Sequence, residues 1–374
     1  MALALAPTVA AAHAELISSD PPAGVVLDRA PVRLTLHFSE AVSPVGGGIE
    51  VLAPSGRRVQ IGAAKSTGRS LSTGIESTET GTFLVTWKVV SQDTHPSRGQ
   101  FTFSAGAPGR LPAPASQATD IGSVAAPGLA LQSASRAIHL AGLALALGPL
   151  LLLLVMMPQE SVRLYRLAGI GILSLVLAEP LALAGQAISL GSFDAASVGD
   201  VLGSNFGRVL GLRMGCALAT WMVIGAVRQS GKPGPVLLLP LLVLAGVDGA
   251  AAHLIRGNQP AAVLLNGIHE ASMAIWLGGL ATLLLLRLPV RPFAGIAAWC
   301  LGVLILSGAG LALLHLARPS DLLFTAYGAV LAVKVLVVGA AILLAALGSR
   351  RLEVVALCGV IALAGLLLSL PPPV

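Results

Sequence analysis

The chain has 374 residues, of which 55% are hydrophobic and 11% are charged, and its net charge is +6. A soluble protein carries roughly a quarter of its residues charged, so this composition excludes a purely soluble protein. The basic residues stand singly between apolar runs. This pattern is typical of residues that set the orientation of membrane spans, and it predicts no nucleic-acid partner. The cysteines all fall in apolar segments, so no disulfide framework or thiolate metal site is expected near the N-terminus.

Residues 1–12, MALALAPTVAAA, have the features of a signal-peptide remnant. Ala10-Ala11-Ala12 fits an A-x-A cleavage pattern, although the stretch is short and lacks a basic start. Cleavage after Ala12 leaves His13 as the mature N-terminus. His13 then offers two nitrogen ligands, its free amine and its imidazole.

Residues 13–105 show the period-two alternation of half-buried strands. Apolar and polar residues alternate over 32–38 and 83–89, and Phe101 and Phe103 open a third run. Turn signals rich in Pro and Gly separate these runs. Short strands at this spacing predict a small antiparallel sandwich or barrel, which we term the head.

Asp93 and His95 fall in the connection between two predicted strands of the head. In extended backbone, residues i and i+2 point to the same side, which suits joint metal ligation. Together with His13 they offer three nitrogens and one carboxylate, a set that favours tetragonal Cu(II). The alternative is a solvated surface loop. His37 lies on a polar strand face and is not assigned as a ligand, whereas Glu40 is either a surface residue or a partner that orients a ligating histidine.

Four segments of the head, taken in order and spacing, resemble the CopC family of periplasmic copper-binding proteins. They are His13-Ala14-Glu15-Leu16, Ser18 to Gly24, Leu36 to Glu40, and Asp93-Thr94-His95-Pro96 through Phe103. The resemblance covers nearly all of the head and implies an all-β, cupredoxin-like sandwich with Cu(II) held by His13, Asp93 and His95. Some family members also carry a Met-rich Cu(I) site, but the head has no Met after Met1, so we expect that second site to be absent.

Residues 106–132 are rich in Pro, Ala, Gly and Ser and predict a flexible linker. Residues 133–374 then form an all-α polytopic bundle of about eight transmembrane helices. The predicted spans are 134–157, 166–188, 206–227, 235–255, 261–286, 293–316, 323–347 and 352–371. Lys and Arg concentrate in every second connection, which predicts that those connections are cytoplasmic. The head and the C-terminus are then outside a bacterial cytoplasmic membrane.

Polar residues within apolar spans are costly and therefore indicate function. His139 opens the first span, and His269 and Met273 lie at i and i+4 on one face of the fifth. Imidazoles with a thioether suit copper, so these three residues form a candidate copper path through the membrane. The alternative is separate interfacial histidines that bond to headgroups or loops.

Two further charged residues lie near the centres of their spans, Glu179 in the second and Lys334 in the seventh. An unpaired charge at that depth is costly, which predicts a mutual ion pair. Asp248, near the end of the fourth span, is the alternative partner.

Four motifs of the membrane part resemble the CopD family of copper-resistance membrane proteins. They are Asn205 to Arg213, His269 to Gly279, Ser307-Gly308 with His315-Leu316, and Thr325 to Gly328 followed by Lys334. The resemblance covers about residues 134–371, and fusion of a CopC-like head to a CopD-like membrane domain is a known arrangement. It implies copper homeostasis and resistance, usually described as copper uptake into the cytoplasm.

We therefore expect a copper-binding and copper-transport protein that is not an enzyme. Its expected partners are copper ions and the lipid bilayer. One alternative is a membrane redox enzyme in which His139 and His269 hold haem. Another is a factor that delivers copper to other periplasmic copper proteins.

Overall fold

The computed structural model describes residues 14–109, 126–155, 161–191, 193–252, 259–316, 318–370 and 372–373. The predicted signal remnant, His13 and residues 110–125 of the predicted linker lie outside these ranges. The chain forms two compact units. We call them the head unit, which joins the β-rich head to residues 184–208, and the helical unit, which holds residues 130–183 and 209–374.

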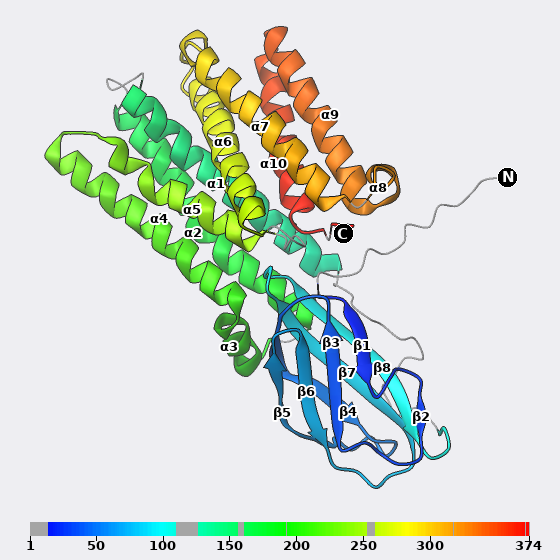
Figure 1. Ribbon diagram of the computed structural model, residues 1–374. Coiled ribbons are helices and arrows are strands. Elements are labelled where there is room, and N and C mark those ends of the chain that lie inside the picture. The colour runs from blue at the N-terminus through cyan, green and yellow to red at the C-terminus, as the bar shows by residue number, and fades with distance from the viewer. Residues whose placement is uncertain are drawn as a thin grey trace. The chain divides into compact units, whose positions relative to one another are not determined.

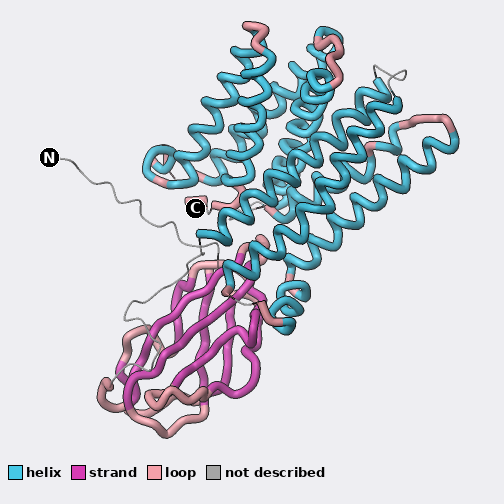
Figure 2. Tube along the Cα trace, turned by 180° about the vertical axis from the view of Figure 1, so that it is seen from behind, coloured by secondary structure: helices cyan, strands magenta, loops and turns pink. Residues whose placement is uncertain are grey.

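The head contains two four-stranded sheets, which face each other and appear in magenta in Figure 2. The first sheet has the order β1 (Leu16–Asp20), β3 (Arg33–Phe38), β6 (Ser70–Ile75), β5 (Gln60–Thr67). The second has the order β2 (Val26–Leu27), β8 (Pro96–Ala105), β7 (Gly81–Ser91), β4 (Val42–Leu52). All pairs are antiparallel except β2 with β8. The predicted sandwich is confirmed.

The alternating apolar residues supply the core between the sheets. Those of β3, β7 and β8 are buried, namely Leu34, Leu36, Phe38, Phe83, Val85, Trp87, Val89, Phe101 and Phe103. Phe38 meets Trp87 edge-on across the sheets, with ring centroids 5.1 Å apart. Val32 departs from the predicted pattern and is 85% exposed, because β3 begins only at Arg33.

In the described ranges, eight apolar helices overlap the eight predicted spans (Figure 1). They are α1 (Ala126–Val155), α2 (Ser161–Leu190), α4 (Asn205–Ser230), α5 (Leu239–Ala251), α6 (Gln259–Leu285), α7 (Ala294–His315), α9 (Ala326–Ala346) and α10 (Arg350–Leu367). Among the described residues, six of these helices are long and apolar enough to cross a membrane. The segments Pro235–Ala251 and Leu352–Leu367 are apolar but shorter, so the structure gives six candidate spans where the sequence predicted about eight.

Small residues allow the helices of the helical unit to approach closely. A Cβ atom at Gly148 of α1 would lie 2.2 Å from the backbone of Gly278 in α6. A Cβ atom at Gly249 of α5 would likewise lie 2.8 Å from the backbone of Gly267 in α6. Such close contacts are typical of helices that pack within a membrane. They bring α1, α5 and α6 together, and each of these helices carries an ionisable side chain.

Two local features differ from the sequence prediction. Helix α1 begins at Ala126, so residues 126–132 of the predicted linker are helical. Pro127, which favoured a linker, is tolerated there because the first helical turn needs no N–H donor. The short helix α3 (Ala195–Gly203) was not predicted, and it begins where the Asp194 side chain accepts a hydrogen bond from the Ser197 amide. That bond lowers the pKa of Asp194.

Candidate metal centre

A tight hairpin turn between β7 and β8 carries the predicted ligands of the head. The Thr94 amide donates to the Ser91 carbonyl at 3.1 Å, and the Ser91 amide donates to the His95 carbonyl at 2.9 Å. Thr94 has φ of 72°, in the left-handed region. This is a three-residue hairpin loop that ends in a left-handed residue. The predicted extended backbone from Asp93 to His95 is therefore wrong, because the chain reverses direction within this loop.

The turn still brings the two side chains together. Asp93 Oδ1 lies 3.0 Å from His95 Nδ1, and the two residues are 3% and 4% exposed. The alternative of a solvated loop is therefore wrong. Nitrogen and oxygen ligands bind first-row metals at about 2 Å, so two donor atoms at this separation can share one ion. The donor set fits Cu(II).

The Ser91 hydroxyl lies between the two ligands. It donates to Asp93 Oδ1, accepts from the His95 amide at 3.1 Å and lies 3.0 Å from the His95 carbonyl. Ser91 is 1% exposed, so these contacts are shielded from bulk solvent. The hydroxyl therefore orients both predicted ligands, and local sequence pattern did not predict this role.

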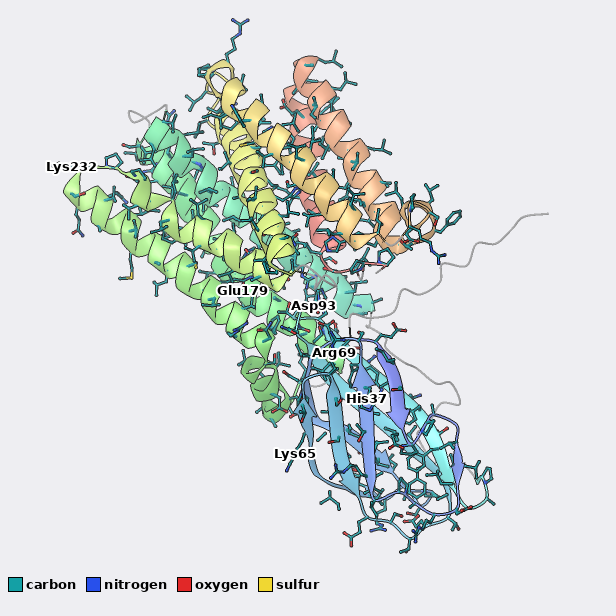
Figure 3. All side chains as sticks on the ribbon, in the orientation of Figure 1. His37, Lys65, Arg69, Asp93, Glu179 and Lys232 are labelled. Carbon is teal, nitrogen blue, oxygen red and sulfur yellow. The ribbon has the colours of Figure 1, made fainter. Side chains whose placement is uncertain are left out.

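Glu40 lies beside the pair and contacts its backbone. The Asp93 amide donates to Glu40 Oε2 at 3.4 Å. Burial, together with the nearby Asp93 carboxylate, raises the pKa of Glu40 to about 9. By contrast, His37 is exposed on β3 and bonds Ser70 Oγ through Nδ1 at 3.0 Å. Figure 3 labels both Asp93 and His37, and the hydrogen-bond partner that the structure gives His37 among the described residues is Ser70.

The described chain begins next to this pair. Ala14 follows His13 in the sequence, is fully buried, and accepts a hydrogen bond through its carbonyl from Ser97 Oγ at 3.1 Å. Ser97 is two residues after His95, so the anchoring of Ala14 fits the predicted role of His13 as a third ligand. His13 itself lies outside the described residues.

Two amide side chains of the head unit also hold the turn. Gln186 Nε2 donates to the Thr94 carbonyl, and Asn205 Nδ2 donates to the Gln92 carbonyl. These carbonyls flank Asp93 on both sides along the chain. The pattern of the sequence did not predict these contacts, because about ninety residues or more separate the partners.

Comparison with known proteins identifies the domain that contains this turn. The CopC domain family matches residues 16–106. Copper resistance protein C of Xanthomonas campestris pv. juglandis is 33% identical over 113 residues, which are 28% of this chain and 88% of that protein. The chain belongs to the CopC family. Protein YobA of Escherichia coli (strain K12) is 34% identical to this CopC chain over 97 residues, which are 25% of the chain and 78% of YobA.

One relative extends the similarity beyond the CopC domain. Copper transport protein CutJ of Bacillus subtilis (strain 168) is 28% identical over 369 residues, which are 89% of this chain and 66% of CutJ. The alignment therefore includes the apolar helices as well as the head.

In the helical unit, the predicted partner of Glu179 was wrong. Glu179 Oε1 lies 3.2 Å from His139 Nδ1 and 3.9 Å from the guanidinium of Arg213. His139 Nε2 in turn lies 2.9 Å from Asp248 Oδ2. The charged neighbours of Glu179 are therefore His139 on α1 and Arg213 on α4, and not Lys334 on α9. Asp248 contacts the same two residues.

The three residues of the predicted membrane copper path have separate surroundings. His139 engages two carboxylates, whereas His269 Nδ1 bonds Ser307 Oγ at 2.9 Å. Met273 packs against the hydrophobic core of the helical unit. Both ring nitrogens of His139 are engaged by carboxylates, whereas His269 bonds a serine of α7, so the two histidines share no hydrogen-bond partner among the residues that the structure describes.

Proposed function

We propose that this protein captures Cu(II) outside the bacterial cytoplasmic membrane and moves copper through its helices into the cytoplasm. The observation that carries the proposal is the buried Asp93–His95 pair, with donor atoms 3.0 Å apart, in a CopC domain joined to six candidate membrane spans. The names of the relatives, copper resistance protein C and copper transport protein CutJ, support the same role.

The chemistry of the head favours the divalent ion. Imidazole nitrogen and carboxylate oxygen suit Cu(II), whereas Cu(I) selects thiolates and thioethers. Residues 14–109 contain neither Cys nor Met. A head of this kind captures Cu(II) and does not store Cu(I).

The topology of the membrane part supports an external head. If all eight apolar helices cross the membrane, basic residues follow the first, third, fifth and seventh spans, which favours a cytoplasmic position for those connections. The head then lies on the opposite side and receives copper before it enters the membrane. We propose transport and not catalysis as the activity, with copper ions and the lipid bilayer as the partners.

Copper accumulation in cells tests the function. Cells that express the chain should accumulate more copper than cells without it, and His95→Ala should remove the excess because it deletes a ligand. His37→Ala is the matched control, since His37 is exposed and bonds only Ser70 among the described residues. Equal accumulation in wild-type and His95→Ala cells at equal expression would refute capture by the head. Lower accumulation with the wild-type chain than without it would refute the inward direction.

A further inference from the structure

Five helices of the helical unit place ionisable side chains in one cluster, which we call the intramembrane cluster. Its members are His139 on α1, Glu179 on α2, Arg213 on α4, Asp248 on α5 and Glu270 on α6. Asp248 is central, because Oδ1 accepts from Arg213 Nε at 2.7 Å and Oδ2 lies 2.9 Å from His139 Nε2. Glu270 also hydrogen-bonds Asp248. Figure 3 labels Glu179 among the helices.

The formal charges of the intramembrane cluster do not balance. With all three carboxyl groups ionised and His139 neutral, the single guanidinium leaves a formal charge of −2. The hydrogen bond between Glu270 and Asp248 needs a proton on one of these two groups, which makes the charge −1, and a bound cation would release that proton. His139, Glu179 and Asp248 are buried, at 5%, 2% and 7% exposure. Uncompensated charge at such a position is costly. A divalent cation would balance the cluster.

The donor atoms are also close enough to share one ion. A ring nitrogen of His139 and carboxylate oxygens of Asp248 and Glu270 all lie within 4.8 Å of one another. A buried carboxylate oxygen of this donor set, Oε1 of Glu270, has no hydrogen-bond partner in the part of the chain that the structure describes. Buried polar atoms normally have a partner, so this oxygen indicates a missing ligand.

The remaining contacts of the cluster are of the kind that orients metal ligands. Arg213 fixes one oxygen of Asp248 and leaves the other directed at His139. Glu179 bonds the second ring nitrogen of His139, as carboxylates commonly do for metal-binding histidines. The cluster thus has three candidate ligands and two residues that orient them.

We infer that His139, Asp248 and Glu270 form a Cu(II) site inside the membrane domain, oriented by Glu179 and Arg213. The inference rests on the proposed function and deepens it, because it names where copper stops within the helices and in which oxidation state. One imidazole and two carboxylates form a nitrogen–oxygen set, which suits Cu(II) and not Cu(I). Of the three residues first predicted for the copper path, only His139 belongs to this site.

Copper titration of the full chain in lipid nanodiscs tests the site, with Cu(II) as the probe and a chelator as competitor. The wild type should bind two Cu(II) ions, and the double variant Asp93→Ala/His95→Ala should bind one. Adding His139→Ala to that variant should weaken the remaining ion by at least about 100-fold, since removal of a ligand exceeds the effect of removing an orienting residue. The electron paramagnetic resonance spectrum of the double variant should show coupling to one imidazole nitrogen.

Two further variants separate ligation from folding. Glu270→Gln keeps the size of the side chain and a neutral oxygen that can still ligate, so it should weaken binding of the ion less than His139→Ala does, by about 10–100-fold. His269→Ala is the matched control on the same helix, because His269 bonds Ser307 and lies outside the intramembrane cluster. It should leave the affinity unchanged.

The outcomes distinguish this inference from the proposed function. If Asp93→Ala/His95→Ala binds no Cu(II), the intramembrane site is refuted. If the wild type then binds one Cu(II), capture of copper by the head still stands. Retention of the ion at full affinity in both the His139→Ala and the Glu270→Gln backgrounds also overturns the site. The titration measures Cu(II) binding alone, so its result does not depend on copper accumulation in cells.

Discussion

Replacing Ser91 by Ala should weaken Cu(II) binding at the head without removing any predicted ligand. Ser91 Oγ donates to Asp93 Oδ1 and accepts from the His95 amide, so a single hydroxyl sets the orientation of both ligands. A hydrogen bond to a charged group contributes about 1.5–3 kcal/mol. Loss of a residue that orients a metal ligand lowers affinity by about 10–100-fold, which corresponds to about 1.4–2.7 kcal/mol. The two estimates agree, and we expect a loss within that range.

The assay is a Cu(II) titration of the full chain against a competing chelator, combined with thermal unfolding of the metal-free protein. Ser104→Ala is the matched control. Ser104 is also buried and bonds Thr82 Oγ1 at 3.1 Å, but it lies at the opposite end of the β7–β8 hairpin from the turn. The control should lose about 1 kcal/mol of stability and keep its copper affinity.

The result that would refute this reasoning is a Ser91→Ala protein with wild-type copper affinity and a loss of stability equal to that of Ser104→Ala. The hydroxyl would then stabilise the hairpin without orienting the ligands. A loss of affinity far above 100-fold would also contradict the argument, since it would mean that Ser91 ligates the ion directly.

Three further predictions follow from local geometry and charge. Thr94→Gly should stabilise the metal-free head by up to about 1 kcal/mol in thermal unfolding. The Thr94 φ of 72° costs a non-glycine residue about 1–2 kcal/mol, and the greater entropy that glycine loses on folding offsets part of the gain. A lower unfolding midpoint in Thr94→Gly would show that the turn is unstrained. Arg213→Ala should destabilise the helical unit by about 3–5 kcal/mol, since it leaves the Asp248 carboxylate without its cation. The control Lys232→Ala, at an exposed position just after the same helix, should change stability by less than about 0.5 kcal/mol. The pKa of Glu40 is raised from 4.5 to about 9, so the contribution of Glu40 to the stability of the metal-free head should be largest below pH 4.5 and should be lost as the pH rises through about 9. Glu40→Gln should flatten that decline in urea unfolding at several pH values, and an unchanged slope would assign it to another group.

The sequence alone determined the elements of this protein. Period-two alternation in residues 32–38 and 83–89 predicted strands, because a sheet buries one face of each strand. Long apolar runs predicted membrane helices, because a helix that crosses lipid must satisfy its backbone internally and present an apolar surface. The Asp93-Thr94-His95 motif, set within a CopC-like pattern, also predicted which residues of the head to examine for copper.

Only the tertiary structure decided how these residues meet. The left-handed Thr94 replaces the extended backbone that spacing predicted, and Ser91 orients both ligands from within the same turn. Local pattern could not predict the partner of Glu179, because an ion pair within a bundle depends on which helices become neighbours and at what depth. His139 and Asp248 are 109 residues apart in the chain, and the packing of α1 and α5 against α6 brings them within hydrogen-bond distance.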